Sequence, residues 1–140
     1  MTVQDIARTA VMTAQRDQTT GNLATVMKEE DVGSVVVVED RQPVGIVTDR
    51  DLTLHVVEPR ADPADVTAEE VMTETPVTVH TDAGVFEATA AMFEHVVRRL
   101  PVVDGEGNLT GIVTLDDIVV LLTDELDNLA GVIEAESPPY

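Results

Sequence analysis

The sequence contains the segment GIVTDRD at residues 45–51 and a near copy of it, GIVTLDD, at residues 111–117. Both follow an apolar run that ends in turn residues, VVVVED from Val35 in one case and LPVVDG from Leu100 in the other. Apolar, β-branched runs bounded by turn residues predict pairs of strands. The same strand pair is therefore expected twice, which indicates an internal repeat.

The repeat extends well beyond these segments. Residues 2–14 (TVQDIARTAVMTA) align without a gap on residues 67–79 (TAEEVMTETPVTV), a spacing of 65, and the same register pairs Met27 with Met92. One extra residue in the second copy, within residues 105–108, raises the spacing to 66, at which the two GIVT segments coincide. Two homologous halves therefore make up the chain.

Each half predicts the order helix, strand, helix, strand, strand, helix. In the second half, Thr67 and Glu70 form a capping-box pattern for a short helix that ends near Met72. Strands are expected at 11–15 and 76–80. The second amphipathic helix begins at Asp82, and the apolar sides of the two amphipathic helices are Leu23, Val26 and Met27 in the first and Val85, Phe86, Thr89, Ala90 and Phe93 in the second. A last helix follows each GIVT, at 49–57 and from 115 to about 128.

The predicted fold class is α/β, of the α+β type, with two tandem domains that each combine a small sheet with packing helices. The first domain covers residues 2–57 and the second covers residues 67–123, with a proline-bearing linker at 58–66. Residues 124–140 hold the end of the last helix and, from Glu134, a loose tail.

The composition excludes several classes of function. The 140 residues are 44% apolar, which is ample for a core. The formal charge of −19 opposes nucleic-acid binding, and the absence of cysteine excludes disulfides and thiol chemistry. No apolar run reaches the roughly 18 residues of a membrane helix, and no apolar leader follows Met1. We expect a cytoplasmic protein without nucleic-acid or membrane partners.

The charge balance also suggests a source. Against 27 Asp and Glu stand only 8 Lys and Arg, of which Lys28 is the one lysine. At molar salt the screening length falls to about 3 Å, so the self-repulsion of such a chain is largely removed. We therefore expect a halophilic archaeal protein that low ionic strength destabilises.

The repeated unit closely resembles the CBS domain, named after cystathionine β-synthase. The resemblance rests on the entry helix and the amphipathic helix of each half, the strands VGSVVVVED and VRRLPVVDG, and the doubled GIVTxxD. It extends from Thr2 to about Thr123. Two such domains in tandem resemble a Bateman module, here a stand-alone one. The resemblance implies a pseudo-twofold pair of domains, two clefts that commonly bind adenine nucleotides, and assembly into a dimer.

Thr48 with Asp51, and Thr114 with Asp117, allow two interpretations. A Thr three residues before an acid at a strand-to-helix junction predicts a cap for the exposed helix N–H groups. The resemblance implies instead that the Asp binds both hydroxyls of a ribose and that the Thr contacts the sugar or phosphate, which suits a carboxylate with two oxygens. The two roles are compatible.

The resemblance also distributes further residues between the clefts. One cleft would combine Thr114 and Asp117 with Ala10, Val32, Gly33 and Ser34. The other would combine Thr48 and Asp51 with Thr75, Val97, Arg98 and Arg99. The arginine pair and Arg50 are candidates for phosphate binding, unless the pair only contacts surface carboxylates. Gly33 and Ser34 replace that pair in the first copy, so we expect clefts of unequal affinity.

Other chemistries lack a signal. His55, His80 and His95 are too scattered for a zinc site, and no GxSxG or GKT pattern occurs. The acidic runs at 116–117 and 124–127 are read as a solvated face rather than a cation site. We expect no metal site, no required cofactor and no catalysis.

The sequence therefore predicts a non-enzymatic sensor of an adenosine compound, with AMP, ADP or ATP favoured over S-adenosylmethionine. Occupancy would be reported to an unidentified protein by a change in the packing of the two halves or of a homodimer. The apolar stripe expected to seal that dimer is Ile118, Leu121, Leu122, Leu126 and Leu129. The alternative is a ligand-free dimerisation scaffold in which the ThrxxAsp pairs only cap helices.

Overall fold

The first apolar run is a central strand of a sheet. The computed structural model of the chain describes residues 1–138, and in it β2 (Ser34–Glu39) pairs in parallel with β1 (Thr13–Ala14) and antiparallel with β3 (Gln42–Thr48). β4 (Thr73–Glu74) completes this sheet on the far side of β3. Because β4 comes from the second half of the sequence, the sheet already joins the two halves.

The second run builds the matching sheet. β6 (Arg99–Val103) lies between the parallel β5 (Val79–His80) and the antiparallel β7 (Leu109–Thr114). Arg8 forms an isolated antiparallel bridge with Ile112 of β7, in the place that β4 takes on β3. The two sheets therefore have equivalent strand pairings, as the sequence repeat predicts.

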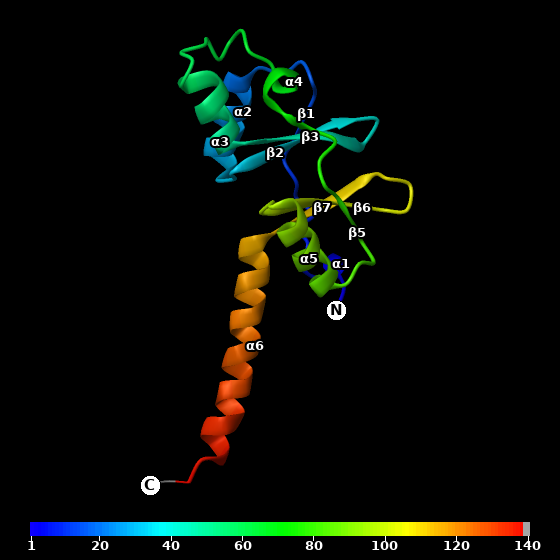
Figure 1. Ribbon diagram of the computed structural model, residues 1–140, viewed down its shortest axis with the longest axis vertical. Helices are drawn as coiled ribbons and strands as arrows, with labels where there is room; N and C mark the ends of the chain where they lie inside the picture. Colours follow the sequence, from blue (N-terminus) through cyan, green and yellow to red (C-terminus); the bar gives the residue numbers. More distant parts are fainter. Residues whose placement is uncertain (139–140) are drawn as a thin grey trace.

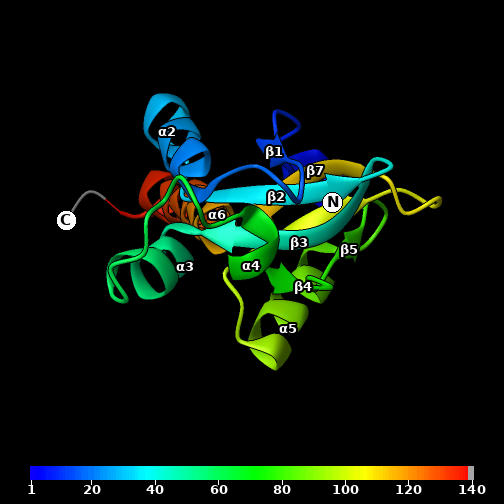
Figure 2. The same cartoon turned by 90° about the horizontal axis from the view of Figure 1, so that it is seen from above.

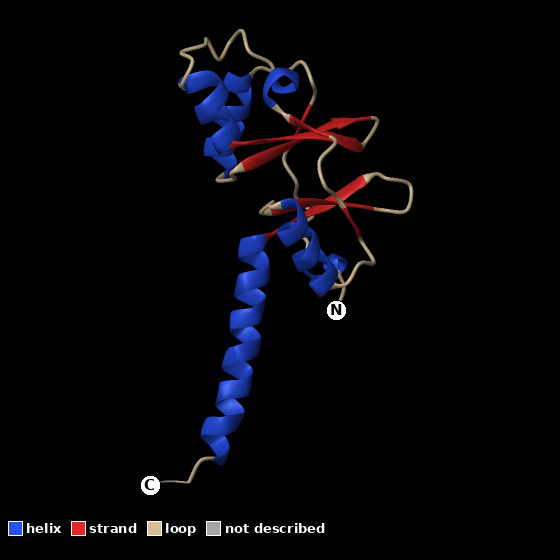
Figure 3. Ribbon diagram, in the orientation of Figure 1, coloured by secondary structure: helices blue, strands red, loops and turns tan. Residues whose placement is uncertain are grey.

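The two sheets lie against each other, with helices on the outer face of each (Figures 1 and 3). Val35 and Val37 belong to the core under the helices of the first half, whereas Val36 is fully buried outside that cluster. Pro101, its equivalent in β6, is also fully buried. Since alternate side chains of a strand point to opposite faces, burial on both faces explains why the run is uniformly apolar.

Helices of different lengths cover the outer faces. α2 (Thr20–Glu30) lies on the first sheet with α3 (Asp49–Leu52), which continues into the π-helical turn η1 (Thr53–Val57). α5 (Val85–His95) and the start of α6 (Leu115–Glu136) cover the second sheet. The view from above shows α2 and α3 on one side of the strands (Figure 2).

The two opening helices are exchanged between the halves. α1 (Val3–Ile6) places Val3 in the core of the second half, and α4 (Ala68–Val71) places Ala68 and Val71 in the core of the first. The anchoring bonds are equivalent: the Val3 N–H donates to the Ala83 carbonyl at 2.8 Å, and the Ala68 N–H donates to that of Gln18 at 2.8 Å. The sequence predicts both helices but not this exchange.

The predicted inner face of the second amphipathic helix is correct at Val85 but wrong at Phe86 and Phe93. α5 begins after Gly84 rather than at Asp82, and its buried residues are Val85, Ala88 and Met92. Phe86 and Phe93 are exposed. A helix with two adjacent apolar stripes can pack through either one, and the small side chain of Ala88 allows close approach to the sheet. For α2 the prediction holds, because Leu23 and Met27 are buried.

Three local predictions also need correction. The strand expected at 76–80 is limited to Val79–His80, because Thr75 adopts a left-handed φ of 49° and Pro76 has no N–H. The side chain of Thr67 makes no cap on α4. α6 continues to Glu136, well past residue 128, since no proline interrupts it.

The expected tail is therefore helical at its start. Glu134 and Glu136 lie within α6, and residues 139–140 of the predicted tail lie outside the described residues. Ile118 of the expected dimer stripe is buried in the core of its own half, and Leu121 packs partly against that core. Within residues 1–138, no helix has both the length and the apolar character to cross a membrane.

Candidate functional site

A cavity of about 590 Å³ lies where the two halves meet. Its volume is within the usual range of small-molecule sites. It contains every residue that the sequence assigns to the second cleft, together with Arg50; these are Thr48, Arg50, Asp51, Thr75, Val97, Arg98 and Arg99. Side chains from β3, α3, β6 and the segment after β4 thus converge on one space.

Thr48 and Asp51 hold each other at the start of α3. The Thr48 Oγ1 accepts the Asp51 N–H at 3.2 Å, and the Asp51 Oδ2 accepts the Thr48 N–H at 2.8 Å. The predicted cap is therefore confirmed. Among residues 1–138, no cationic side chain lies within ion-pair distance of Asp51, and its Oδ1 makes no hydrogen bond. That oxygen is available to a ligand.

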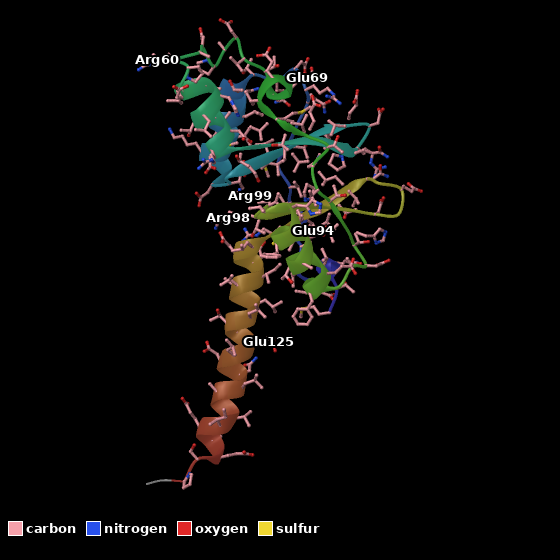
Figure 4. The ribbon with its side chains drawn as sticks, in the orientation of Figure 1. Arg60, Glu69, Glu94, Arg98, Arg99 and Glu125 are labelled. Carbon is pink, nitrogen blue, oxygen red and sulfur yellow. The ribbon has the colours of Figure 1, made fainter. Side chains whose placement is uncertain are left out.

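Three of the chain's 8 basic residues line the same cavity: Arg50, Arg98 and Arg99. Arg98 contacts the Asp116 carboxylate at 3.3 Å on the surface, as the alternative interpretation of the pair expects. Arg99 is half-buried and, within residues 1–138, makes no such ion pair. Figure 4 shows both arginines at the junction of the two layers, above the start of α6.

Gly33 gives Arg99 its position. A Cβ built on Gly33 would lie 2.7 Å from an Arg99 guanidinium nitrogen, so a larger residue would displace that side chain. The Gly33 carbonyl also accepts the N–H of Asp49, a cavity residue, at 3.0 Å. Gly33 was assigned to the other cleft, but its neighbours in the structure belong to this one.

Thr75 contributes a strained backbone. Its φ of 49° is in the left-handed region, which is unusual for a β-branched residue. Its N–H donates to the Val44 carbonyl at 3.2 Å, which ties the segment after β4 to the first half. Strained residues of this kind concentrate at functional sites, in agreement with the place of Thr75 on the cavity wall.

The first cleft is different because the carboxylate of Asp117 is already paired with an arginine, Arg8. Thr114 and Asp117 form the same cap on α6, with both hydrogen bonds at 3.2 Å. The second carboxylate oxygen, Asp117 Oδ1, takes no part in the cap and accepts hydrogen bonds from Arg8 Nε at 3.1 Å and from Arg8 Nη2 at 2.8 Å. Arg8 is equivalent in the repeat to Thr73, which lines the other cavity without contacting Asp51 in this way.

The ion pair shifts both titrating groups. Partial burial alone raises the pKa of Asp117, but hydrogen bonds from Arg8 and Thr114 outweigh it, so the pKa lies below its ordinary value. The hydrogen bond and charge of Asp117 raise the pKa of Arg8. Asp117 thus stays ionised and paired over the ordinary pH range.

The other residues assigned to the first cleft are Ala10, Val32, Gly33 and Ser34. Ala10 is exposed, and Val32 and Ser34 are partly buried near the start of β2. Neither Thr114 nor Asp117 lines the cavity described above. The composition of this cleft stays a prediction.

Sequence reasoning missed several residues of the site. Ile46, Asp49, Thr73, Pro76, Val77 and Val96 also line the cavity. Arg8 was missed as well, because only the fold brings it to Asp117; the repeat alignment shows no more than that Arg8 stands opposite Thr73. In residues 1–138, no three or more His, Asp or Glu side chains are grouped to hold a metal ion.

A family model for the CBS domain matches residues 3–58 and 68–124. An uncharacterised protein of Methanopyrus kandleri is 40% identical over 120 residues, which are 85% of this chain and 61% of that protein. The chain therefore spans less than two thirds of that relative. A CBS domain-containing protein of Bacillus subtilis is 36% identical over 118 residues, 84% of this chain and 83% of its own length. Relatives in archaea and bacteria leave the halophilic archaeal source a prediction.

Solved structures of CBS domain proteins resemble the chain as well. The CBS domain pair of protein MJ0100, in complex with 5′-methylthioadenosine and S-adenosyl-L-methionine, superposes with a TM-score of 0.80 at 26% identity, over 89% of this chain and 98% of that one. The CBS domain protein PAE2072 from Pyrobaculum aerophilum, complexed with AMP, gives 0.76 at 26% identity, over 84% and 89%. The chain belongs to the CBS domain family and is a tandem pair of such domains.

Proposed function

We propose that the chain is a sensor of adenosine compounds that binds AMP, ADP or ATP in the 590 Å³ cavity. One observation carries the proposal: an unpaired Asp51 oxygen shares this cavity with three arginines in a chain of formal charge −19. Like CBS domains in general, it would act as a regulatory module without catalysis.

The residues of the cavity match the parts of a nucleotide. Asp51 would accept both ribose hydroxyls, because its Oδ2 is fixed by the Thr48 N–H while Oδ1 is free. Arg99 and Arg50 would bind phosphate, for which a guanidinium is well suited. Backbone groups beside Val77 and Val97 would read the adenine between aliphatic side chains.

The arginines favour a phosphorylated ligand. Two solved relatives bind adenosine compounds, one with AMP and one with 5′-methylthioadenosine and S-adenosyl-L-methionine. Neither of the latter two compounds carries a phosphate: 5′-methylthioadenosine has no anionic group, and S-adenosyl-L-methionine has a single carboxylate together with an ammonium and a sulfonium cation. The phosphate of a nucleotide offers more negative charge to the guanidinium groups. We therefore place AMP, ADP and ATP ahead of S-adenosylmethionine.

A ligand in this cavity would touch both halves of the chain. Thr48 and Asp51 come from the first half and Val97 and Arg99 from the second. Since a ligand shifts an equilibrium toward the state that it binds better, occupancy would favour one packing of the halves. A protein partner, which the sequence leaves unidentified, would read that change.

Calorimetric titration of AMP, ADP, ATP and S-adenosylmethionine at high salt tests the proposal. Asp51→Asn, which retains a residue suited to helix starts, should abolish the main site, and Asp117→Asn should leave it intact. Absence of heat from every adenosine compound with folded protein would contradict the proposal. The scaffold alternative instead predicts that nucleotide leaves the Tm unchanged and that Asp51→Ala costs only a cap, about 1 kcal/mol.

A further inference from the structure

The last helix extends beyond the body of the protein. α6 contains 22 residues and, at 1.5 Å per residue, is about 33 Å long. Its start packs against the core through Ile118, whereas the rest projects away from the other elements (Figure 1). The core of a single CBS domain accounts for its first turns only.

The exposed part carries a heptad pattern. Apolar side chains recur at alternating spacings of four and three residues, and each is between 36% and 68% exposed; they are Leu115, Val119, Leu122, Leu126, Leu129 and Ile133. We call these six residues the α6 seam. A repeat of 3.5 residues is typical of helices that wind around each other, whereas a helix lying on a core follows 3.6.

Most charges of α6 lie away from the seam. In the heptad, Asp117, Asp124, Asp127 and Glu134 fall at positions b and f, on the far side of the helix. Beside the exposed seam, Glu125 is the acid at a g position, and in a parallel pair it would face Ala130 of the other helix rather than another acid. Asp116 falls at an e position, but its g partner would be residue 111, which precedes α6, and Glu136 falls at the d position that ends α6, beyond the seam. Along residues 115–133, two chains of −19 can therefore meet without opposing like charges.

We propose that α6 forms a parallel, in-register, two-stranded coiled coil with α6 of a second copy of this chain. Val119, Leu126 and Ile133 occupy the a positions, and Leu115, Leu122 and Leu129 occupy the d positions. β-Branched residues at a with leucine at d favour two parallel strands.

The surface at the base of α6 continues the seam. A groove of about 500 Å³ between α5 and α6 is lined by Phe93 and Val96 together with Val119 and Leu122 of the seam. Phe93 and Val96 are both strongly exposed. A second copy seated on the seam would thus cover apolar groups of α5 as well. The homodimer expected from the sequence gains a defined contact, which does not depend on nucleotide.

Sedimentation of the full chain in 1 M NaCl tests the contact, since this salt reduces the repulsion between the two copies. We expect a dimer for the natural sequence and a folded monomer, checked by circular dichroism, for Leu126→Asp. Val120→Asp is the matched control, because Val120 is exposed on the same helix but lies at a b position. A monomeric natural chain, or a dimer unaffected by Leu126→Asp, overturns the proposal.

Single cysteines test the orientation in a chain that has none. Leu122→Cys and Leu129→Cys, made separately, should each form an intermolecular disulfide, because identical d positions meet in a parallel pair. In an antiparallel pair, at most one of residues 122 and 129 can lie opposite its own copy. A disulfide in only one of the two variants therefore refutes the parallel arrangement. Asp127→Cys, at a b position, should remain reduced. Failure of AMP binding in calorimetry would leave these results unchanged.

Discussion

Replacing Arg8 by threonine should open the first cleft. In the repeat, Thr73 stands where Arg8 stands, and the carboxylate beside Thr73, Asp51, has a free oxygen. The carboxylate beside Arg8 does not, because its Oδ1 accepts two guanidinium bonds. Arg8→Thr therefore gives the first cleft the chemistry of the second at this position.

The structure sets the size of the effect. The Arg8 side chain is 69% exposed and the Asp117 side chain 13% exposed, at a separation of 2.8 Å. Solvent around Arg8 weakens the pair, so the upper end of the range for exposed ion pairs, about 1 kcal/mol, is appropriate. A ribose that must displace Arg8 loses about 1 kcal/mol of binding free energy. Removing the Arg8 side chain should therefore tighten binding about fivefold.

Calorimetry with AMP measures both stoichiometry and affinity. We expect one site per chain in the natural protein at micromolar concentrations, and a second, weaker site that becomes about fivefold tighter in Arg8→Thr. Adding Asp117→Asn to Arg8→Thr should remove the gain. The reciprocal change, Thr73→Arg, should weaken the main site by pairing with Asp51.

Two results would refute this reasoning. If Arg8→Thr leaves every binding constant unchanged, the ion pair does not compete with the ligand. If Asp117→Asn removes the main site of the natural protein while Asp51→Asn does not, the clefts have been assigned in the wrong order.

Three further predictions follow from other contacts. Within one chain Val96 is 90% exposed, so burial in that chain does not offset the cost of its left-handed φ of 53°. Val96→Asn, made in the monomeric Leu126→Asp background, should raise the free energy of unfolding by about 1 kcal/mol, and Asp31→Val at the equivalent site, φ 54°, should lower it similarly in urea titrations. Because the folded protein lowers the pKa of Asp117, this carboxylate adds stability that is present above its unfolded pKa, near 3.9, and is lost as the pH falls through the folded pKa. The difference in unfolding free energy between the natural chain and Arg8→Thr should therefore vanish in acid. A difference that stays constant down to about pH 2 would contradict this prediction. Val3→Ala should cost about 2 kcal/mol, measured by thermal unfolding, although Val3 lies in a four-residue helix, because it is fully buried.

Local patterns were sufficient for the hairpins and for the caps on α3 and α6, although not for the cap expected at Thr67. The runs at Val35 and Leu100 combine β-branched residues with polar bends, and both formed the predicted strand pairs, which are antiparallel. Thr48 and Asp51 formed their cap because its two bonds join residues three apart. Such features depend on neighbours in sequence and are legible without a structure.

The features that were missed depend on distant partners. α1 and α4 derive from the same repeat unit, so nothing local says which core each will join. On α5, the stripe of Phe86 and Phe93 is as apolar as the stripe of Val85 and Met92, and packing on the sheet selects the second. Arg8 looks like any surface arginine until the fold brings it to Asp117, 109 residues away in the chain.

The crossed placement of α1 and α4 has a consequence for biosynthesis. A ribosome releases α1 first, yet the hydrophobic site that receives Val3 includes Ile118, which is synthesised late. The first core must likewise wait for Met72. The two domains are therefore not completed strictly one after the other during synthesis, because each core needs residues from the other half of the sequence. A cut within the linker leaves the first fragment without α4 and the second without α1.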